Sequence, residues 1–106
     1  MTTTDRKILE RFKELLRKEL PDFSLILFGS RARGDEDAYS DMDVLVLVGG
    51  KCDDKTRDYV SNCAWEAGYE QGIVIVPVVF TRNEWETGPE RYSLLVQAVK
   101  REGLFV

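Results

Sequence analysis

Three short apolar runs, over residues 24–28, 42–48 and 73–80, constrain the fold of this 106-residue chain more than any other feature. Runs of this length are typical of buried strands and are short for helices. Around them, apolar residues recur at helical spacing over residues 4–20 and 53–68. The alternation predicts an α/β (α+β) fold in which helices cover a small mixed sheet of three to four strands.

Individual residues predict where several of these elements begin and end. Thr4 and Asp5 suit the start of the first helix, and Pro21 suits its end. Pro77 has no N–H group to donate within a sheet. We therefore expect the third strand to lie at an edge of the sheet or to carry a bulge.

The last quarter of the chain carries its own boundary signals. Residues 81–84 form a capping-box pattern that begins a short turn. Pro89 is expected to open the last helix and Gly103 to end it, before a short closing strand over residues 104–106. Four residues of this helix are expected to face the core: Leu94, Leu95, Ala98 and Val99.

The composition is that of an ordinary globular protein, and the length predicts a single domain over residues 1–106. The formal net charge of −4 provides no overall positive field for a nucleic-acid backbone, so a polynucleotide partner is not expected. The chain contains no histidine, which excludes catalysis by an imidazole base of its own. Cys52 and Cys63 fit neither a redox pair nor a zinc site, and we expect Cys63 to be buried.

Residues 1–13 lack the apolar segment of a signal peptide, and no apolar run is as long as a membrane span. We therefore expect no membrane association and a cytoplasmic location.

Asp41 and Asp43 head the second apolar run, one residue apart. Side chains at positions i and i+2 of a strand point to the same side, so the two carboxylates should repel each other unless a cation lies between them. Hard carboxylate oxygens suit Mg²⁺ or Mn²⁺. The alternative, in which Asp41 caps a loop and Asp43 faces solvent, is disfavoured because carboxylates are costly on an otherwise buried strand.

The polar turn that follows the first run could bind phosphate. Gly29 and Ser30 can offer backbone N–H groups and a hydroxyl to an anion, although a simple turn is the alternative. Of the two arginines in the turn, we place Arg33 ahead of Arg31 as a phosphate ligand. Residues 35–37 are acidic and are expected to form a hydrated loop.

The sequence GSRARG over residues 29–34, followed by SDMDVLV over 40–46, resembles the signature of the polymerase-beta-type nucleotidyltransferase superfamily, and the chain is similar in size and layout to its minimal (MNT) branch. The resemblance implies metal-dependent transfer of a nucleoside monophosphate from an NTP, which we expect to be ATP, to an acceptor hydroxyl. It implies that Asp41 and Asp43 are the catalytic metal ligands, for Mg²⁺ or Mn²⁺. It further implies nucleotide binding by Gly29 and Ser30; we add Arg33 and Ser40, which lie within the same signature.

The chain departs from the family pattern in its third apolar run. The family usually carries a third acidic residue there, and the corresponding position falls at or near Pro77. Three interpretations stay open: weak activity, substitution by Glu70 or Glu84, or a domain that binds nucleotide without catalysis.

Minimal members of the family often act beside a helical HEPN-type partner protein, as antitoxins. The resemblance therefore implies a nucleotide partner and a possible HEPN-type partner, and homo-oligomers are also compatible with it. The alternatives are a non-catalytic nucleotide-binding or regulatory antitoxin subunit and a structural domain in which the two aspartates are incidental.

Overall fold

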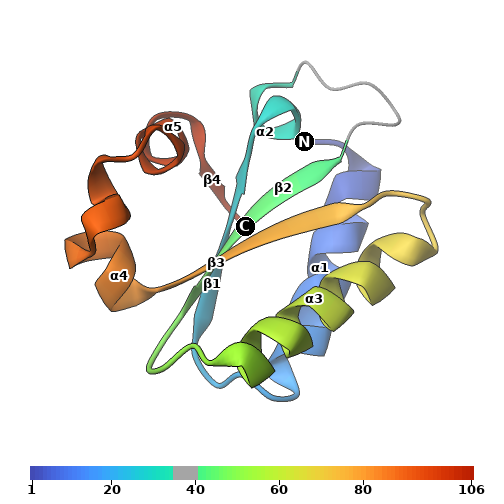
Figure 1. Cartoon of the computed structure of the whole chain (residues 1–106). Coiled ribbons are helices and arrows are strands. Elements are labelled where there is room, and N and C mark those ends of the chain that lie inside the picture. Colours follow the sequence, from blue (N-terminus) through green and yellow to red (C-terminus); the bar gives the residue numbers. More distant parts are fainter. Residues whose placement is uncertain (35–40) are drawn as a thin grey trace.

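The computed structural model of the chain describes residues 1–34 and 41–106. Helices and strands follow each other in a mixed order along the chain (Figure 1). Their bounds are α1 (Thr3–Arg17), β1 (Phe23–Phe28), α2 (Ser30–Arg33), β2 (Met42–Val48), α3 (Asp54–Tyr69), β3 (Ile75–Thr81), α4 (Arg82–Thr87), the 3-10 helix η1 (Pro89–Tyr92), α5 (Leu94–Glu102) and β4 (Leu104–Phe105).

Within the described residues, four strands form one sheet in the order β3-β2-β1-β4. β1 is antiparallel to both β2 and β4, whereas β2 and β3 are parallel. The sheet is therefore mixed, and the expected α/β architecture is confirmed, including the short closing strand. β3 lies at an edge, as Pro77 predicted.

The backbone of β3 explains how the edge accommodates this proline. The N–H group of Met42 donates to the carbonyl of Val74 at 2.9 Å, so the backbone groups of Val74 face β2. Alternate residues of a strand direct their backbone groups to opposite sides, so Pro77 directs its ring nitrogen away from β2. The missing N–H group of Pro77 therefore removes no hydrogen bond from the β2–β3 ladder.

Helices cover the two faces of the sheet unequally (Figure 1). On one face, which we call the closed face, α1 and α3 pack side by side over the inward residues of all three long strands. On the other, the open face, α4 and α5 cover a smaller cluster formed by Ile26, Leu45, Leu47 and Val99. Phe12, at the centre of α1, is fully buried on the closed face, and Cys63 of α3 is buried there too, as expected.

The first helix begins earlier and ends earlier than Thr4 and Pro21 predicted. Its N-cap is Thr2, whose hydroxyl accepts from the N–H group of Asp5 while the Asp5 carboxylate accepts from the N–H group of Thr2. The reciprocal bonds make a capping box, which fixes the start two residues before the predicted cap. None of the helices in the described part of the chain is long and apolar enough to cross a membrane.

The expected last helix is divided into two. Pro89 opens the 3-10 helix η1, and Ser93 then caps α5 by accepting from the N–H group of Val96. This second cap shifts the helical phase, so that Leu94 is 90% exposed and Val96 and Val99 are the buried residues. The predicted inward orientation of Leu94 and Leu95 is therefore wrong.

Candidate functional site

Gly29 makes the sharp turn between β1 and α2. Its φ angle of +77° lies in the left-handed region that favours glycine. A Cβ atom at this position would also overlap the Oδ2 atom of Asp43. The turn therefore needs glycine for two reasons, and one of them is direct contact with a predicted metal ligand.

The two aspartates lie at the start of β2, beside this turn. Asp43 pairs with Phe28 of β1 on one side and with Val76 of β3 on the other. Met42, between the aspartates, is fully buried in the closed-face core. Because side chains alternate along a strand, Asp41 and Asp43 are directed to the open face. The structure thus brings Gly29, Asp41 and Asp43 together, as the sequence predicted.

The electrostatics of this pair favour a cation. Burial, the largest cause, raises the pKa of Asp43 above its ordinary value, and the negative charge of Asp41 raises it further. The positive charge of Arg33 acts in the opposite direction and lowers it. A half-buried carboxylate that is destabilised by a neighbouring carboxylate gains most from a bound cation. The donor set is hard oxygen, so it fits Mg²⁺ or Mn²⁺.

The short helix α2 places backbone N–H groups and the Ser30 hydroxyl beside Gly29. The N–H groups of Ala32 and Arg33 donate to the carbonyl of Gly29, which closes the turn. Ser30 is the first residue of the helix, where a backbone N–H group has no acceptor within the helix. An anion beside Gly29 and Ser30 would therefore face both an N–H group and a hydroxyl.

The two arginines of α2 differ sharply in their surroundings. Arg31 is 3% exposed, and its Nη1 atom lies 2.5 Å from the Oδ1 atom of Asp5, itself fully buried. This buried ion pair joins the turn to the start of α1. The side chain of Arg33 is 48% exposed and lies 2.9 Å from a carboxylate oxygen of Glu102. The preference for Arg33 over Arg31 as the phosphate ligand stays a prediction, and Arg31 has an evident structural role.

Glu102 is a residue near the site that the sequence analysis did not identify. It ends α5, and hydrogen bonding from Arg33, the largest cause, lowers the pKa of its carboxyl. Nothing in the local sequence could have found it, because residues 33 and 102 meet only when β4 pairs with β1. Ser40, which was predicted to bind nucleotide, lies outside the described residues.

The missing third carboxylate can be placed from the strand register. Pro77 pairs with Val44 and therefore lies on the closed face, whereas Val76 pairs with Asp43 and shares its face. The β3 side chain next to Asp43 on the open face is thus that of Val76, which cannot bind a metal. Among the described residues, no group of three or more acidic, cysteine or histidine side chains is placed to hold a metal.

Neither Glu70 nor Glu84, the two possible substitutes for a third metal ligand, lies at the candidate site. Glu84 is held in the capping box of α4, where its carboxylate accepts from the N–H group of Thr81 at 3.0 Å. Thr81 pairs with Val48, at the far end of β2 from Asp43, roughly 16 Å along the strand. Glu70 follows the C-terminus of α3 and is exposed.

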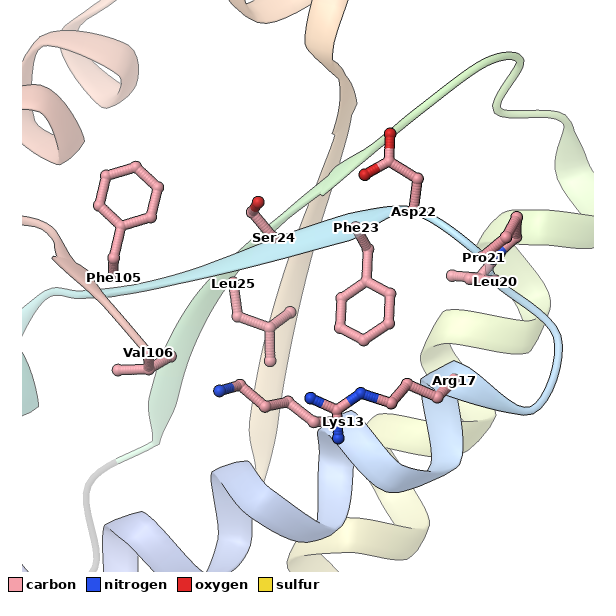
Figure 2. A pocket seen from close by; sticks show the side chains of 10 residues that line it. All are labelled: Lys13, Arg17, Leu20, Pro21, Asp22, Phe23, Ser24, Leu25, Phe105 and Val106. Carbon is pink, nitrogen blue, oxygen red and sulfur yellow. The ribbon is translucent and has the colours of Figure 1, made fainter.

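A separate hollow of about 410 Å³ lies beside the start of β1 (Figure 2). Lys13 and Arg17 of α1 reach into it from below the strand, and Phe23 and Leu25 point toward them. It shares no lining residue with Gly29 and the aspartates, which lie at the other end of β1. This hollow is therefore distinct from the candidate active site.

Comparison with known proteins gives this site a context. The family model for the nucleotidyltransferase domain matches residues 6–96. A "putative protein adenylyltransferase" of Methanocaldococcus jannaschii is 35% identical over 79 residues, which cover 73% of this chain and 80% of that protein.

Two solved structures share the fold. One is a toxin–antitoxin determined with AMP-PNP, with a TM-score of 0.63 and 23% identity, covering 91% of this chain and 69% of that chain. The other is a "putative nucleotidyltransferase" from Sulfolobus solfataricus, with a TM-score of 0.51 and 17% identity, covering 99% of this chain and 86% of that one. The chain belongs to the nucleotidyltransferase domain family and is a minimal-type (MNT) enzyme that transfers a nucleoside monophosphate.

Proposed function

We propose that this enzyme transfers AMP from ATP to a hydroxyl group of a protein acceptor, with Mg²⁺ or Mn²⁺ bound by Asp41 and Asp43. The observation that carries the proposal is the contact between Gly29 and Asp43, which leaves no room for a Cβ atom between the turn and the carboxylate. A phosphate seated on the turn would lie directly beside a cation held by the aspartates. The choice of AMP and of a protein acceptor is supported by the name of the M. jannaschii relative.

Each proposed site residue has a separate task. Gly29 and Ser30 receive the phosphates, and Asp41 and Asp43 would hold a metal ion that would supply positive charge beside them. Arg33 places a planar cation beside the same phosphates. Ser40 is proposed to bind nucleotide on the strength of the sequence signature alone.

The reaction needs positioning and charge neutralisation more than covalent chemistry by the protein. The acceptor oxygen forms a bond to the α-phosphorus, the bond from that phosphorus to the bridging oxygen breaks, and pyrophosphate leaves. The hydroxyl proton passes to solvent, because Val76 occupies the position from which a third carboxylate could take it. This absence predicts slow turnover compared with an enzyme that has all three carboxylates.

A second candidate function is favoured by the same valine. The domain could bind ATP as the regulatory subunit of a toxin–antitoxin pair, with a HEPN-type helical protein as its partner. The support is the likeness in fold to a toxin–antitoxin structure, together with the lack of a third carboxylate beside Asp41 and Asp43 in the part of the chain that the structure describes. A homo-oligomer and a cytoplasmic location are compatible with either function.

The decisive experiment is the double substitution Asp41→Asn with Asp43→Asn. The matched control is Asp54→Asn with Asp58→Asn, which removes two exposed carboxylates from α3. Each protein is incubated with α-labelled ATP, Mg²⁺ and the product of the neighbouring gene, and ATP binding is followed by calorimetry. We expect the wild type and the control to bind ATP with Mg²⁺ and to transfer label, and the site variant to do neither.

The two candidate functions give different results in this experiment. Metal-dependent binding of ATP by the wild type without transfer of label would favour the regulatory subunit. Transfer by the site variant at the wild-type rate would show that the metal ligands are assigned wrongly.

A further inference from the structure

The C-terminal end of α5 lies close to the C-terminal end of β1. A Cβ atom at Gly103 would lie 2.5 Å from the carbonyl oxygen of Val99 and 2.6 Å from the Cγ2 atom of Ile26, so glycine allows the helix end to approach the sheet. Leu104 then pairs with Leu27 in β4, and the N–H group of Val106 donates to the carbonyl of Leu25. The position of Glu102 is therefore fixed by the segment that follows it.

This arrangement places one carboxylate on each side of the C-terminal end of β1. On one side, Asp43 of β2 pairs with Phe28; on the opposite side, Glu102 ends α5, two residues before β4 begins at Leu104. Because adjacent strands are about 4.8 Å apart, the two flanking strands are about 10 Å from each other. Arg33 is the last residue of α2, which directly follows β1 in the chain. It bonds to Glu102 at 2.9 Å and acts electrostatically on Asp43.

We propose that Glu102 is a positioning residue for the transfer reaction: it holds the Arg33 guanidinium away from Asp43, so that Asp43 stays available to the metal. The inference rests on the proposed function, because it assumes that Asp43 binds a cation. Arg33 is bonded to Glu102 and its charge acts on Asp43, and an arginine paired with Asp43 would compete with the metal for the same oxygens. The contact with Glu102 holds the Arg33 guanidinium at the end of α5, on the other side of β1 from Asp43.

The alternative role for Glu102 is that of a third metal ligand. A ligand and a positioning residue both weaken metal binding when they are neutralised, so a single variant does not distinguish them. They differ when Arg33 is removed as well. Without Arg33, a positioning residue has nothing left to hold, whereas a ligand is still missing from the metal.

The test is therefore Mn²⁺ binding to the protein without nucleotide, measured by the EPR signal of free Mn²⁺. The proteins are wild type, Glu102→Gln, Arg33→Gln and the double variant. Glu14→Gln is the control, because Glu14 also forms an ion pair with an arginine, Arg11, on the exposed side of α1. Urea unfolding of each protein identifies any general loss of stability.

We expect Glu102→Gln to weaken Mn²⁺ binding about tenfold, the size of one charge contact near the surface. The double variant should bind Mn²⁺ as well as Arg33→Gln does, and Glu14→Gln should bind like the wild type. Unchanged binding by Glu102→Gln would overturn the positioning role alone, and weak binding that persists in the double variant would identify Glu102 as a ligand instead. A wild type that binds no Mn²⁺ would overturn the proposed metal site together with this inference.

Discussion

The two faces of the sheet differ in how much apolar surface they bury and in whether they carry site residues. The closed face buries the inward side chains of three strands beneath two long helices. The open face has a small core under α4 and α5, centred on Leu45 and Leu47. Asp43 lies on the open face, two residues before Leu45 on the same strand, where it is half-buried.

The difference shows how one short strand can serve both stability and chemistry. Residues 42, 44, 46 and 48 of β2 are fully or almost fully buried on the closed face. The alternate residues begin with a carboxylate and continue with two leucines on the open face. The closed face supplies most of the apolar burial. The open face can therefore leave the region around Asp43 uncovered by helices.

The strongest test of this comparison is Phe12→Ala on α1. Phe12 is fully buried in the closed-face core, and its removal should lower the free energy of unfolding by about 3–5 kcal/mol. Val99→Ala, which removes a smaller buried side chain from the open face, should cost roughly 1–2 kcal/mol. Urea unfolding followed by circular dichroism measures both. Equal losses would contradict the unequal division of the core.

A second test compares the two arginines of α2. Arg31→Ala leaves Asp5 as a buried charge without this ion-pair partner and should cost about 3–5 kcal/mol of unfolding free energy. Arg33→Ala removes an exposed ion pair and should cost about 1 kcal/mol or less.

In variants that stay folded, we expect Arg33→Ala to weaken ATP binding more than Arg31→Ala does, which is the reverse of their order of effect on stability. Arg33→Ala is expected to weaken binding of ATP with Mg²⁺ in calorimetry, whereas Arg31→Ala should act mainly through stability. A protein destabilised as much by Arg33→Ala as by Arg31→Ala would contradict the division of roles.

Much of the fold could be predicted from local patterns. The strand over residues 42–48 was predicted with its observed bounds because residues 44–48 are continuously apolar and a glycine pair follows them. Pro77 predicted an edge strand because its missing donor is tolerated there. The division of the last helix was missed because Ser93 offered a second cap within a stretch that already had a helix start at Pro89.

The candidate site was predictable where it is local in sequence and not where it depends on pairing between distant segments. Gly29 and the two aspartates lie in one signature, and the β1–β2 hairpin brings them together. The pairing of Arg31 with Asp5, and of Arg33 with Glu102, joins residues 26 and 69 positions apart. Only the register of β3 could place Val76, rather than Pro77, opposite Asp43.

The smallest expected effect concerns the pKa of Asp43, which tests the electrostatics of the open face without any metal. Burial and the charge of Asp41 raise this pKa, and Arg33 lowers it. A carboxyl whose pKa is raised in the folded state contributes stability below its unfolded pKa and loses that contribution as the pH rises through the folded pKa. The free energy of unfolding should therefore fall slightly across this window as Asp43 ionises.

Carboxyl-carbon NMR titration of the metal-free protein measures the pKa of Asp43 directly. Asp41→Asn removes a repelling charge and should lower it, whereas Arg33→Gln removes an attracting charge and should raise it. Asp58→Asn, a substitution on α3, should leave it unchanged. Opposite shifts in the two site variants would establish that both charges act on Asp43, and an Asp43 that titrates below an ordinary aspartate would contradict the half-buried, repelled carboxylate on which the metal site depends.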